Sequence, residues 1–403
     1  MKKLIFVSII LTVLFCSCGK DPVAQDNPLV PIELTKAESE ITADINAFGI
    51  DLFKILSKDD QMMISPLSIS QALAMTAYGA EGETYDQIVK TLGFEDFSAE
   101  EIGAYYKKMV GELVKADVNS SLFFANSIWA NSDIPIKPSY KEGVADYFSS
   151  EVTNADLTSP STLNSINDWV SEKTGGKIGH YLESLDIFDK MLLINALYFK
   201  SSWKSGAFDL CEDPIDFIDI DGECNKVKMM RKNKLMPYSS FEGFERVSVA
   251  YGNGAFAMDI ILPPADIKFK DAVATFDSSV YNKLLDANIS EIYELILTMP
   301  LFSFDTTQKL NDALKEMGMS VPFTGLADFS KMSDSDLYIS SVYHKTSINV
   351  DQAGTVAAAA SSVNVGTTMN DYRPTEITVD RPFVFTIRET STNTILFIGQ
   401  KVR

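Results

Sequence analysis

Histidine is almost absent from this sequence, and that scarcity limits the chemistry the chain can perform. Among 403 residues only His180 and His344 are histidines, so a nucleophile activated by histidine would have to use one of them. His180 follows the turn-like stretch 175–179, and we expect it to be an exposed loop residue. His344 follows the alternating segment 337–343, which predicts a strand and a buried or half-buried imidazole. A histidine-dependent hydrolase is therefore disfavoured.

The usual signatures of cofactor and metal sites are also missing. The chain has no GxxxxGK(S/T) phosphate loop and no GxGxxG after a predicted strand. A zinc site needs several compactly arranged histidine, cysteine or carboxylate ligands, and no such spacing occurs. Acidic residues are so numerous that no carboxylate pair stands out as catalytic. We therefore expect no enzymatic activity, no cofactor and no metal ion.

Positive charge is in short supply. The chain carries 35 lysines and arginines against 55 aspartates and glutamates, for a formal net charge of −20. Phosphate binding depends on clustered lysine and arginine, so we expect neither nucleic acid nor an anionic membrane surface as a partner. One basic run does occur, at Lys226, Lys228, Arg231, Lys232 and Lys234. It is typical of a solvated strand and turn, and an exosite for an acidic partner is the alternative interpretation.

The apolar run at residues 4–15 is too short to span a bilayer. Because two lysines precede it and a small residue follows it, the run predicts a secretory signal peptide. The stretch 14–18 looks like a bacterial lipobox with Cys18 as the lipidated residue. Cys16 is a poorer candidate, since bulky Phe15 would occupy its cleavage position. A plain signal peptide with an incidental cysteine is the alternative.

These features divide the chain into three parts. We expect a lipoprotein signal peptide at residues 1–17, an extended tether with several prolines at 18–36, and one folded domain at 37–403. The protein would then be exported and anchored by lipid in the outer membrane, either at the cell surface or facing the periplasm. We expect membrane contact only through that lipid anchor, and we expect a monomer.

Cysteine is rare once the leader is set aside. Only Cys211 and Cys224 remain, too few for a disulfide framework even in an oxidising compartment. The Asp-Gly pair at 221–222 predicts a hairpin. In the register of a two-residue loop Cys224 faces Asp219 rather than Cys211, which favours free thiols.

Hydrophobic periodicity predicts a mixed domain. Apolar residues recur at helical spacing in segment 37–57, and a second apolar helix is expected from Ser65 to Tyr78, ended by Gly79. With no internal repeat and no later interdomain linker, the pattern indicates one α+β domain with extensive sheets. The segments predicted as strands are 247–251, 255–262, 294–304, 337–341, 377–389 and 395–402.

Five blocks of the sequence resemble the serpin family, and they occur in the family's order. Any one of them would be weak, but together they extend over about nine-tenths of the chain. The blocks are 64–70 (ISPLSIS) with 79–84 (GAEGET); 125–126 (AN) with 166–170 (INDWV) and 174–178 (TGGKI); 195–200 (NALYFK) with Trp203 and Phe208; 344–345 (HK) with 354–360 (GTVAAAA); and 381–385 (RPFVF) with 396–399 (LFIG).

The resemblance implies the serpin fold, an α+β architecture of about three β-sheets surrounded by eight to nine helices, with an exposed reactive-centre loop. In serpins the residues matching Ser65, Ser68, Asn195 and His344 lie under the central sheet where two strands part. They would form a polar cluster that controls sheet opening, and Trp203 matches an aromatic residue at the top of that opening. From spacing alone, the two serines are equally well interpreted as helix caps.

The segment 354–370 carries the implied mechanism. Its alanine run favours helix by propensity, yet it has little to bury, so an exposed, mobile loop is the local prediction. Small or β-branched uncharged side chains alternate along it, so it could enter a sheet as a strand. A protease attacking the loop would form an acyl-enzyme and be trapped when the hinge inserts. The implied hinge residues are Gly354, Thr355, Val356, Ala357, Ala358, Ala359 and Ala360.

The position of the scissile bond follows from spacing in the family. Counting Gly354 as the fifteenth residue before the bond places it between Thr368 and Met369. Counting back from Pro382 gives a position about three residues later, so other bonds stay open. All candidates suit an elastase-like or broad-specificity serine protease, and papain-like cysteine proteases are further candidate targets. The rival bonds are Met369-Asn370 and Val365-Gly366.

We therefore expect a suicide inhibitor of serine proteases, and two other functions stay open. One is a non-inhibitory serpin-fold surface lipoprotein that binds a ligand or partner. Such relatives usually carry bulky or charged hinge residues, and segment 355–362 has none. The other is an unrecognised hydrolase, which the histidine shortage opposes. Gln352 and Val356 depart from the acidic residues usual in the family, a change expected to alter only native-state metastability.

Overall fold

The computed structural model describes residues 27–179, 181–355 and 374–403. The described end of the expected tether contacts the folded body. The side-chain amide of Asn27 donates to Asp117 Oδ1 at 2.7 Å, and the Ile32 N–H donates to Ser391 Oγ at 2.9 Å. Several predictions lie outside the described residues: the signal peptide, Cys18 with the rest of tether segment 18–26, His180, hinge residues 356–360, and Val365, Gly366, Thr368, Met369 and Asn370 of the candidate bonds.

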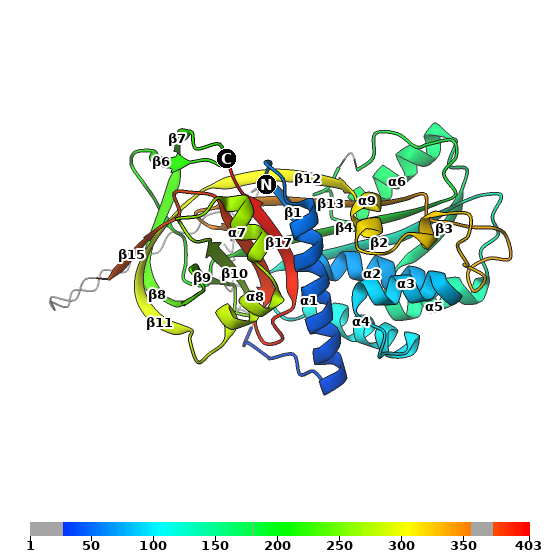
Figure 1. The fold of residues 1–403 in the computed structure, drawn as a ribbon, viewed down its shortest axis with the longest axis horizontal. Helices are drawn as coiled ribbons and strands as arrows, with labels where there is room; N and C mark the ends of the chain where they lie inside the picture. The colour runs from blue at the N-terminus through cyan, green and yellow to red at the C-terminus, as the bar shows by residue number, and fades with distance from the viewer. Residues whose placement is uncertain (1–26, 180, 356–373) are drawn as a thin grey trace, which may run out of the picture.

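Helices and strands are interspersed along the chain (Figure 1). Nine α-helices occur within the described residues, in agreement with the eight to nine expected. They are α1 (Lys36–Leu56), α2 (Pro66–Ala77), α3 (Gly82–Leu92), α4 (Ala99–Leu113), α5 (Pro138–Phe148), α6 (Pro160–Lys173), α7 (Phe269–Thr275), α8 (Ser278–Leu285) and α9 (Asn311–Glu316), with a short 3-10 helix at Val321–Phe323.

The strands form one nine-stranded sheet, one six-stranded sheet and one two-stranded hairpin. The nine-stranded sheet has the order β1 (Met62–Ile64), β17 (Ile395–Lys401), β16 (Phe383–Glu389), β10 (Phe256–Leu262), β9 (Phe244–Tyr251), β8 (Met229–Phe241), β11 (Glu291–Pro300) and β15 (Thr375–Thr378), with β5 (Asp209–Leu210) beside β8. The six-stranded sheet has the order β12 (Phe302–Lys309), β13 (Ser341–Asp351), β14 (Gly354–Thr355), β4 (Met191–Ser202), β2 (Ser121–Asn131) and β3 (Glu151–Ala155). The hairpin is β6 (Ile215–Ile218) with β7 (Cys224–Val227). The α+β fold class with three sheets is therefore confirmed.

The first two helices begin where their capping residues predict. Thr35 and Glu38 form a capping box at the start of α1, satisfying backbone N–H groups that have no partner within the helix. Ser65 caps α2 by accepting a hydrogen bond from the Ser68 N–H at 3.3 Å, and Pro66 occupies the first helical position. Every residue of α2 is buried, which makes it the central helix of the domain.

The six-stranded sheet is covered on both faces. Alternate residues of β4 point to opposite sides, so Leu193 and Leu197 join the large core with α2, whereas Leu192 and Ile194 join a smaller core with α6. Figure 1 shows β2, β3 and β4 between α6 on one side and α2 to α5 on the other. A strand added to this sheet would consequently have to fit between two packed layers.

Some predicted strands have different bounds in the structure. The predicted strand 294–304 is two strands, β11 and β12, that belong to different large sheets and meet at Leu301. The predicted strand 377–389 also divides, into β15, which pairs with β11, and β16, which pairs with β10 and β17; Pro382, which has no backbone N–H, directly precedes β16. Segment 337–340 is not a strand, and β13 begins only at Ser341.

The predicted hairpin register is wrong by one residue. Cys224 lies opposite Ile218, not Asp219. Asp219 instead closes a wider turn, because its Oδ1 accepts the N–H groups of Asp221 at 3.0 Å and Glu223 at 2.9 Å. Cys211 and Cys224 are nevertheless free thiols, as expected.

Candidate functional site

The first two residues of the predicted hinge already lie inside the six-stranded sheet. Gly354 and Thr355 form β14, which pairs antiparallel with both neighbours: Thr355 lies opposite Val350 of β13 and Ser201 of β4. Below this point no residue separates β4 from β13. The chain thus enters the sheet as a strand for two residues, and residue 356 begins the segment outside the described structure.

Gly354 could not be another residue without moving β4. Its φ of +151° is one that L side chains rarely adopt, and a Cβ atom there would lie 2.2 Å from the Ser201 carbonyl oxygen. Thr355 is 1% exposed, and its hydroxyl lies 2.6 Å from the Tyr251 hydroxyl. Both residues are therefore held tightly between the two strands.

Trp203 directly follows β4 and packs beside the hinge residues. Its ring stacks on Tyr251 with 4.4 Å between centroids, and its Nε1–H donates to the Asp351 carbonyl at 3.0 Å. The Trp203 backbone N–H also donates to Ala353 at 3.0 Å. We refer to Trp203, Tyr251, Gly354 and Thr355 as the hinge site.

In their N-terminal halves, β4 and β13 are paired with each other. Ser341 to Thr346 lie opposite Leu192 to Leu197 in a parallel register, whereas the upper parts of the same strands are separated by β14. The two strands therefore diverge towards their C-terminal ends, after Leu197 in β4 and Thr346 in β13. We call the boundary between β4 and β13 the seam. It is closed where the two strands pair directly and open where β14 lies between them.

Five buried polar side chains meet beneath the closed part of the seam. Asn195 Nδ2 donates to the hydroxyl of Ser68 at 2.5 Å and to the Asn126 side-chain oxygen, and Asn195 Oδ1 contacts His344 Nδ1. The Ser65 N–H donates to His344 Nε2 at 3.0 Å. We call Ser65, Ser68, Asn126, Asn195 and His344 the polar cluster. It joins α2, β2, β4 and β13 in one hydrogen-bonded group.

The hydrogen bonds of the cluster fix the protonation state of His344. Nε2 accepts the Ser65 N–H, so the ring proton must be on Nδ1, where it faces an amide oxygen. Complete burial lowers the pKa of His344 to about 3, although the contact with Asn195 opposes the shift. The imidazole is therefore neutral at physiological pH, and a second proton would displace the Ser65 N–H.

The sequence matches one protein family across most of its length, in agreement with the geometry of the site. Residues 43–403 match the family described as "Serpin (serine protease inhibitor)". The chain belongs to the serpin family. Among curated relatives, leukocyte elastase inhibitor of Bos taurus is 31% identical over 378 residues, covering 90% of this serpin and 98% of the relative.

Solved serpin structures are similar to this one over nearly their whole length. The thermophilic serpin tengpin in its native state has 33% sequence identity and a TM-score of 0.84, covering 94% of this serpin and 97% of the tengpin chain. Human thyroxine-binding globulin has 26% identity and a TM-score of 0.82, covering 91% and 99%. Both similarities extend across the two large sheets.

Some residues of the site were missed by sequence reasoning. Asn126 lies in a serpin-like block but was given no role, and Tyr251 ends a predicted strand without further signal. Tyr181 is the third: its hydroxyl oxygen lies 2.8 Å from the Asn195 carbonyl and 2.6 Å from the Tyr343 carbonyl, which share its one proton, and it accepts the Asn195 N–H at 3.0 Å. Tyr181 thus bridges β4 and β13 from the side opposite α2.

The basic run of this serpin is divided among separate partners. Lys226 pairs with Asp216 at 2.7 Å and Arg231 with Glu376 at 3.1 Å. Lys232 donates to three backbone carbonyls in segment 205–207, at 2.9, 2.9 and 2.5 Å. These contacts fit the solvated-strand interpretation, because much of the charge is already engaged within the chain.

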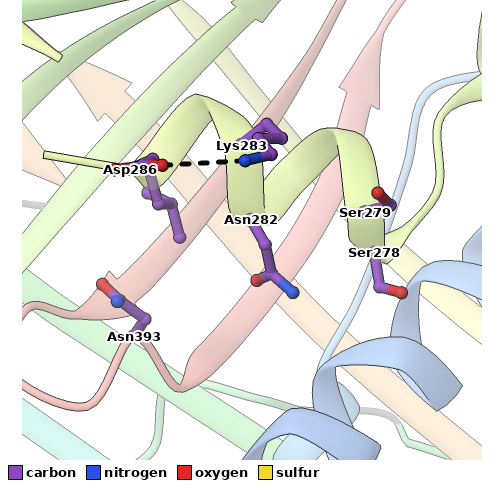
Figure 2. Close-up of a pocket in the computed structure, with 7 residues that line it drawn as sticks. Ser278, Ser279, Asn282, Lys283, Asp286 and Asn393 are labelled. Carbon is purple, nitrogen blue, oxygen red and sulfur yellow. Dashed lines mark ion pairs between the residues drawn. The ribbon is translucent and has the colours of Figure 1, made fainter. Parts of the chain in front are cut away.

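A cavity lies beside α8, away from the hinge. It has a volume of about 670 Å³ and is open and polar. Figure 2 shows Ser278, Ser279 and Asn282 along α8, the ion pair between Lys283 and Asp286, and Asn393 on the turn between β16 and β17.

The described ranges contain no group of three or more histidine, cysteine or acidic residues placed to hold a metal ion. In the same ranges no helix combines the length and apolar character that crossing a bilayer requires.

Proposed function

We propose that this serpin is a suicide inhibitor of serine proteases, in which the cleaved loop inserts between β4 and β13. The observation that carries the proposal is the position of Gly354 and Thr355, which already pair between these strands. The sequence that continues from them, 356–362, contains no charged or large side chain that would resist burial between the two packed layers. The protein itself would catalyse nothing.

The energy for trapping would come from new strand pairing. About 14 inserted residues, at ~1 kcal/mol net per hydrogen bond, would gain on the order of 10–15 kcal/mol. That is comparable with the whole stability of many domains, which is 5–15 kcal/mol. The native form would then be metastable, held by the closed part of the seam and the polar cluster. A protease still acylated when insertion occurs would be carried along and distorted.

Target choice rests on the loop sequence and on one relative. The proposed bond is Thr368-Met369, with Met369-Asn370 and Val365-Gly366 as rivals. These residues suit elastase-like or broad-specificity enzymes, and a relative named leukocyte elastase inhibitor supports that class. Papain-like cysteine proteases are included, since they also form acyl-enzymes.

Export and anchoring belong to the same proposal. The leader 1–17 and Cys18 support a lipid-anchored protein at the outer membrane, on the cell surface or in the periplasm. An inhibitor on this tether would act on proteases arriving at the cell envelope. We propose that it acts as a monomer.

The direct test is incubation with elastase, trypsin, chymotrypsin and papain, followed by denaturing gels. We expect a denaturant-stable complex near the summed mass with at least one enzyme, and mass spectrometry of the released C-terminal fragment to identify the bond. A nicked chain of about 40 kDa with every enzyme, and no complex, would contradict inhibition.

A ligand-binding role is the second candidate. It is favoured by the similarity to thyroxine-binding globulin and by the open cavity beside α8. The nicked-only result on the gels would support this alternative. The small, uncharged hinge sequence favours inhibition over it.

A further inference from the structure

Strands β8 and β11 leave two aliphatic side chains in solvent. Leu235 of β8 and Ile292 of β11 are each 70% exposed, and Leu235 lies opposite Glu294 of β11. Ile292, two residues before Glu294, lies opposite Pro237 and so points to the same face of the nine-stranded sheet. Ile296, two residues after Glu294, is half-buried on that face. We call Leu235, Pro237, Ile292 and Ile296 the outer patch.

The outer patch lies where the chain that follows the loop joins the sheet. β15 runs parallel to β11, with Thr375 opposite Leu295. Continuing that register back by one residue places Pro374 beside Glu294, which pairs with Leu235. Figure 1 shows β15, β11 and β8 at the end of the molecule opposite to α5 and α6. A protein that holds the chain just before residue 374 must consequently stand next to this patch.

Acidic side chains accompany the outer patch. Glu294 is half-buried on the same face, and Glu291 is exposed at the start of β11. Arg231, also on this face, is already paired with Glu376 at 3.1 Å. The whole chain has a formal net charge of −20. A complementary partner would therefore present apolar side chains with positive charge around them.

The size of the outer patch distinguishes between partners. A stable dimer buries about 800 Å² on each subunit, far more than two exposed aliphatic side chains and their neighbours supply. A partner that is already held through a second contact needs much less. A protease bound at the loop is such a partner, because residue 369 is at most about 18 Å of extended chain from residue 374. A protease domain of about 220 residues has a radius of gyration of about 17 Å, so it would reach the patch.

We propose that the outer patch is a second contact for the target protease, beside the cleft that holds the loop. The proposal rests on the proposed inhibitory function and narrows its target class. The target is a basic serine protease with exposed apolar side chains next to the part of its cleft that holds the residues after the cut bond. Target choice then depends on β8 and β11 as well as on the loop.

Binding of an inactive protease tests the patch apart from trapping. The probe is an elastase of basic isoelectric point whose active-site serine is replaced by alanine, so that it binds the loop but forms no acyl-enzyme. The double variant Leu235→Thr with Ile292→Thr should raise its Kd at least about tenfold, since burying two aliphatic side chains is worth at least that factor. An unchanged or lower Kd, or no binding to the wild type, would overturn the proposal.

A matched control locates the effect. Leu326 is 83% exposed and lies in a segment whose Asp328 N–H donates to Thr84 of α3 at 2.8 Å, away from β8 and β11. Leu326→Thr should leave the Kd unchanged. Threonine is well tolerated in strands, and circular dichroism establishes that each variant is folded. An equal loss of binding in the control would show that the outer patch is not the contact and would overturn the proposal.

The charge of the partner and a second copy of the chain have separate tests. Glu291→Gln with Glu294→Gln should weaken elastase binding about threefold at low ionic strength. That difference should vanish at about 0.5 M salt, where exposed charges are screened. Unchanged binding at low salt would overturn the assignment of a basic partner. A wild-type dimer on size-exclusion chromatography that the double variant dissociates would assign the patch to a second copy and overturn the proposal.

Active elastase separates this proposal from the inhibitory function. The double variant should still form the denaturant-stable complex, but more slowly, because its hinge and loop are unchanged while its encounter complex is weaker. A wild type that is only nicked, yet binds inactive elastase through the patch, would refute inhibition and leave the patch standing. A complex that forms equally fast with the wild type and the double variant would refute the patch and leave inhibition standing.

Discussion

Thr355 must suit two arrangements of the same sheet. Its side chain is 1% exposed and bonded to Tyr251 before any cleavage, and it would remain between β4 and β13 after insertion. Its neighbour Gly354 has no room for a Cβ against Ser201. Residue size and charge at the hinge are therefore constrained already in this structure, before the proposed insertion.

Thr355→Arg should convert the serpin from inhibitor to substrate. A guanidinium at this position would lose several kcal/mol by burial without a partner, so the hinge would leave the seam and fail to insert. The measurement is the ratio of covalent complex to nicked chain on denaturing gels with elastase, and Thr355→Ser is the matched control. A Thr355→Arg variant that forms as much complex as the control would refute this role.

His344 should make the native state sensitive to acid. Its pKa is about 3 when folded and about 6.5 in an unfolded chain, so the unfolded state binds the proton first as pH falls. The contribution to stability is complete above about pH 6.5 and is lost as pH falls from there towards 3. At pH 5 the loss is about 2 kcal/mol.

Urea unfolding at pH 7 and pH 5 measures this contribution when wild type is compared with His344→Gln. The variant should be less stable at pH 7 but should lose about 2 kcal/mol less on acidification, because it lacks the titrating imidazole. Equal losses in the two proteins would show that the His344 proton plays no part.

At the scale of elements, β4 and β13 are held together from both faces of the sheet. The polar cluster acts from the α2 side, and the Tyr181 hydroxyl acts from the α6 side, sharing its proton between the Asn195 and Tyr343 carbonyls and accepting the Asn195 N–H. Opening the seam must break both sets. In the proposed mechanism, the two sets together would provide the barrier that keeps the native form closed.

Tyr181→Phe should lower that barrier without altering the packing. Loss of the hydroxyl should destabilise the native form by about 1–3 kcal/mol. A synthetic peptide of the sequence 354–367 should then insert between β4 and β13 correspondingly faster. Tyr198→Phe is a matched control, because the buried Tyr198 hydroxyl has no partner within the described residues and its removal should be neutral or stabilising. Similar insertion rates for the two variants would contradict the bridging role of Tyr181.

The elements could be predicted from local sequence wherever local chemistry determines them. Thr35, Ser65 and Pro66 mark helix starts, and α1 and α2 begin within a residue of the predicted positions. The predicted strand 294–304 failed because its apolar pattern continues through Leu301, where the chain passes between sheets. Tertiary context, rather than periodicity, decides such a break.

The site was predictable only where the family's motifs extend. Ser65, Ser68, Asn195 and His344 were grouped through the resemblance to serpins, and the structure brings them together. Tyr181 could not be found this way, since its role depends on a hydroxyl entering the ladder between strands that are distant in sequence. Asn126 lies within a family motif, but only the structure places it against Asn195.

At the scale of the whole molecule, the six-stranded sheet is filled over most of its area and open at one end. β14 lies between β4 and β13 for two residues. In their N-terminal halves, β4 and β13 pair directly with each other and leave no place for a further strand. The free energy of that missing strand is the quantity on which inhibition depends. In the proposed mechanism, the closed pairing of β4 with β13 would withhold that free energy until cleavage.

Thermal unfolding of intact and loop-cleaved protein tests this claim most directly. Thermolysin is a suitable protease for the cut, because a zinc-bound water attacks the bond and no acyl-enzyme forms. Mass spectrometry selects product cut between residues 365 and 373. At about 2.1 cal/mol/K of unfolding entropy per residue, a gain of about 10–15 kcal/mol predicts a Tm roughly 13–19 °C above that of the intact chain. An unchanged or lower Tm after cleavage would contradict loop insertion.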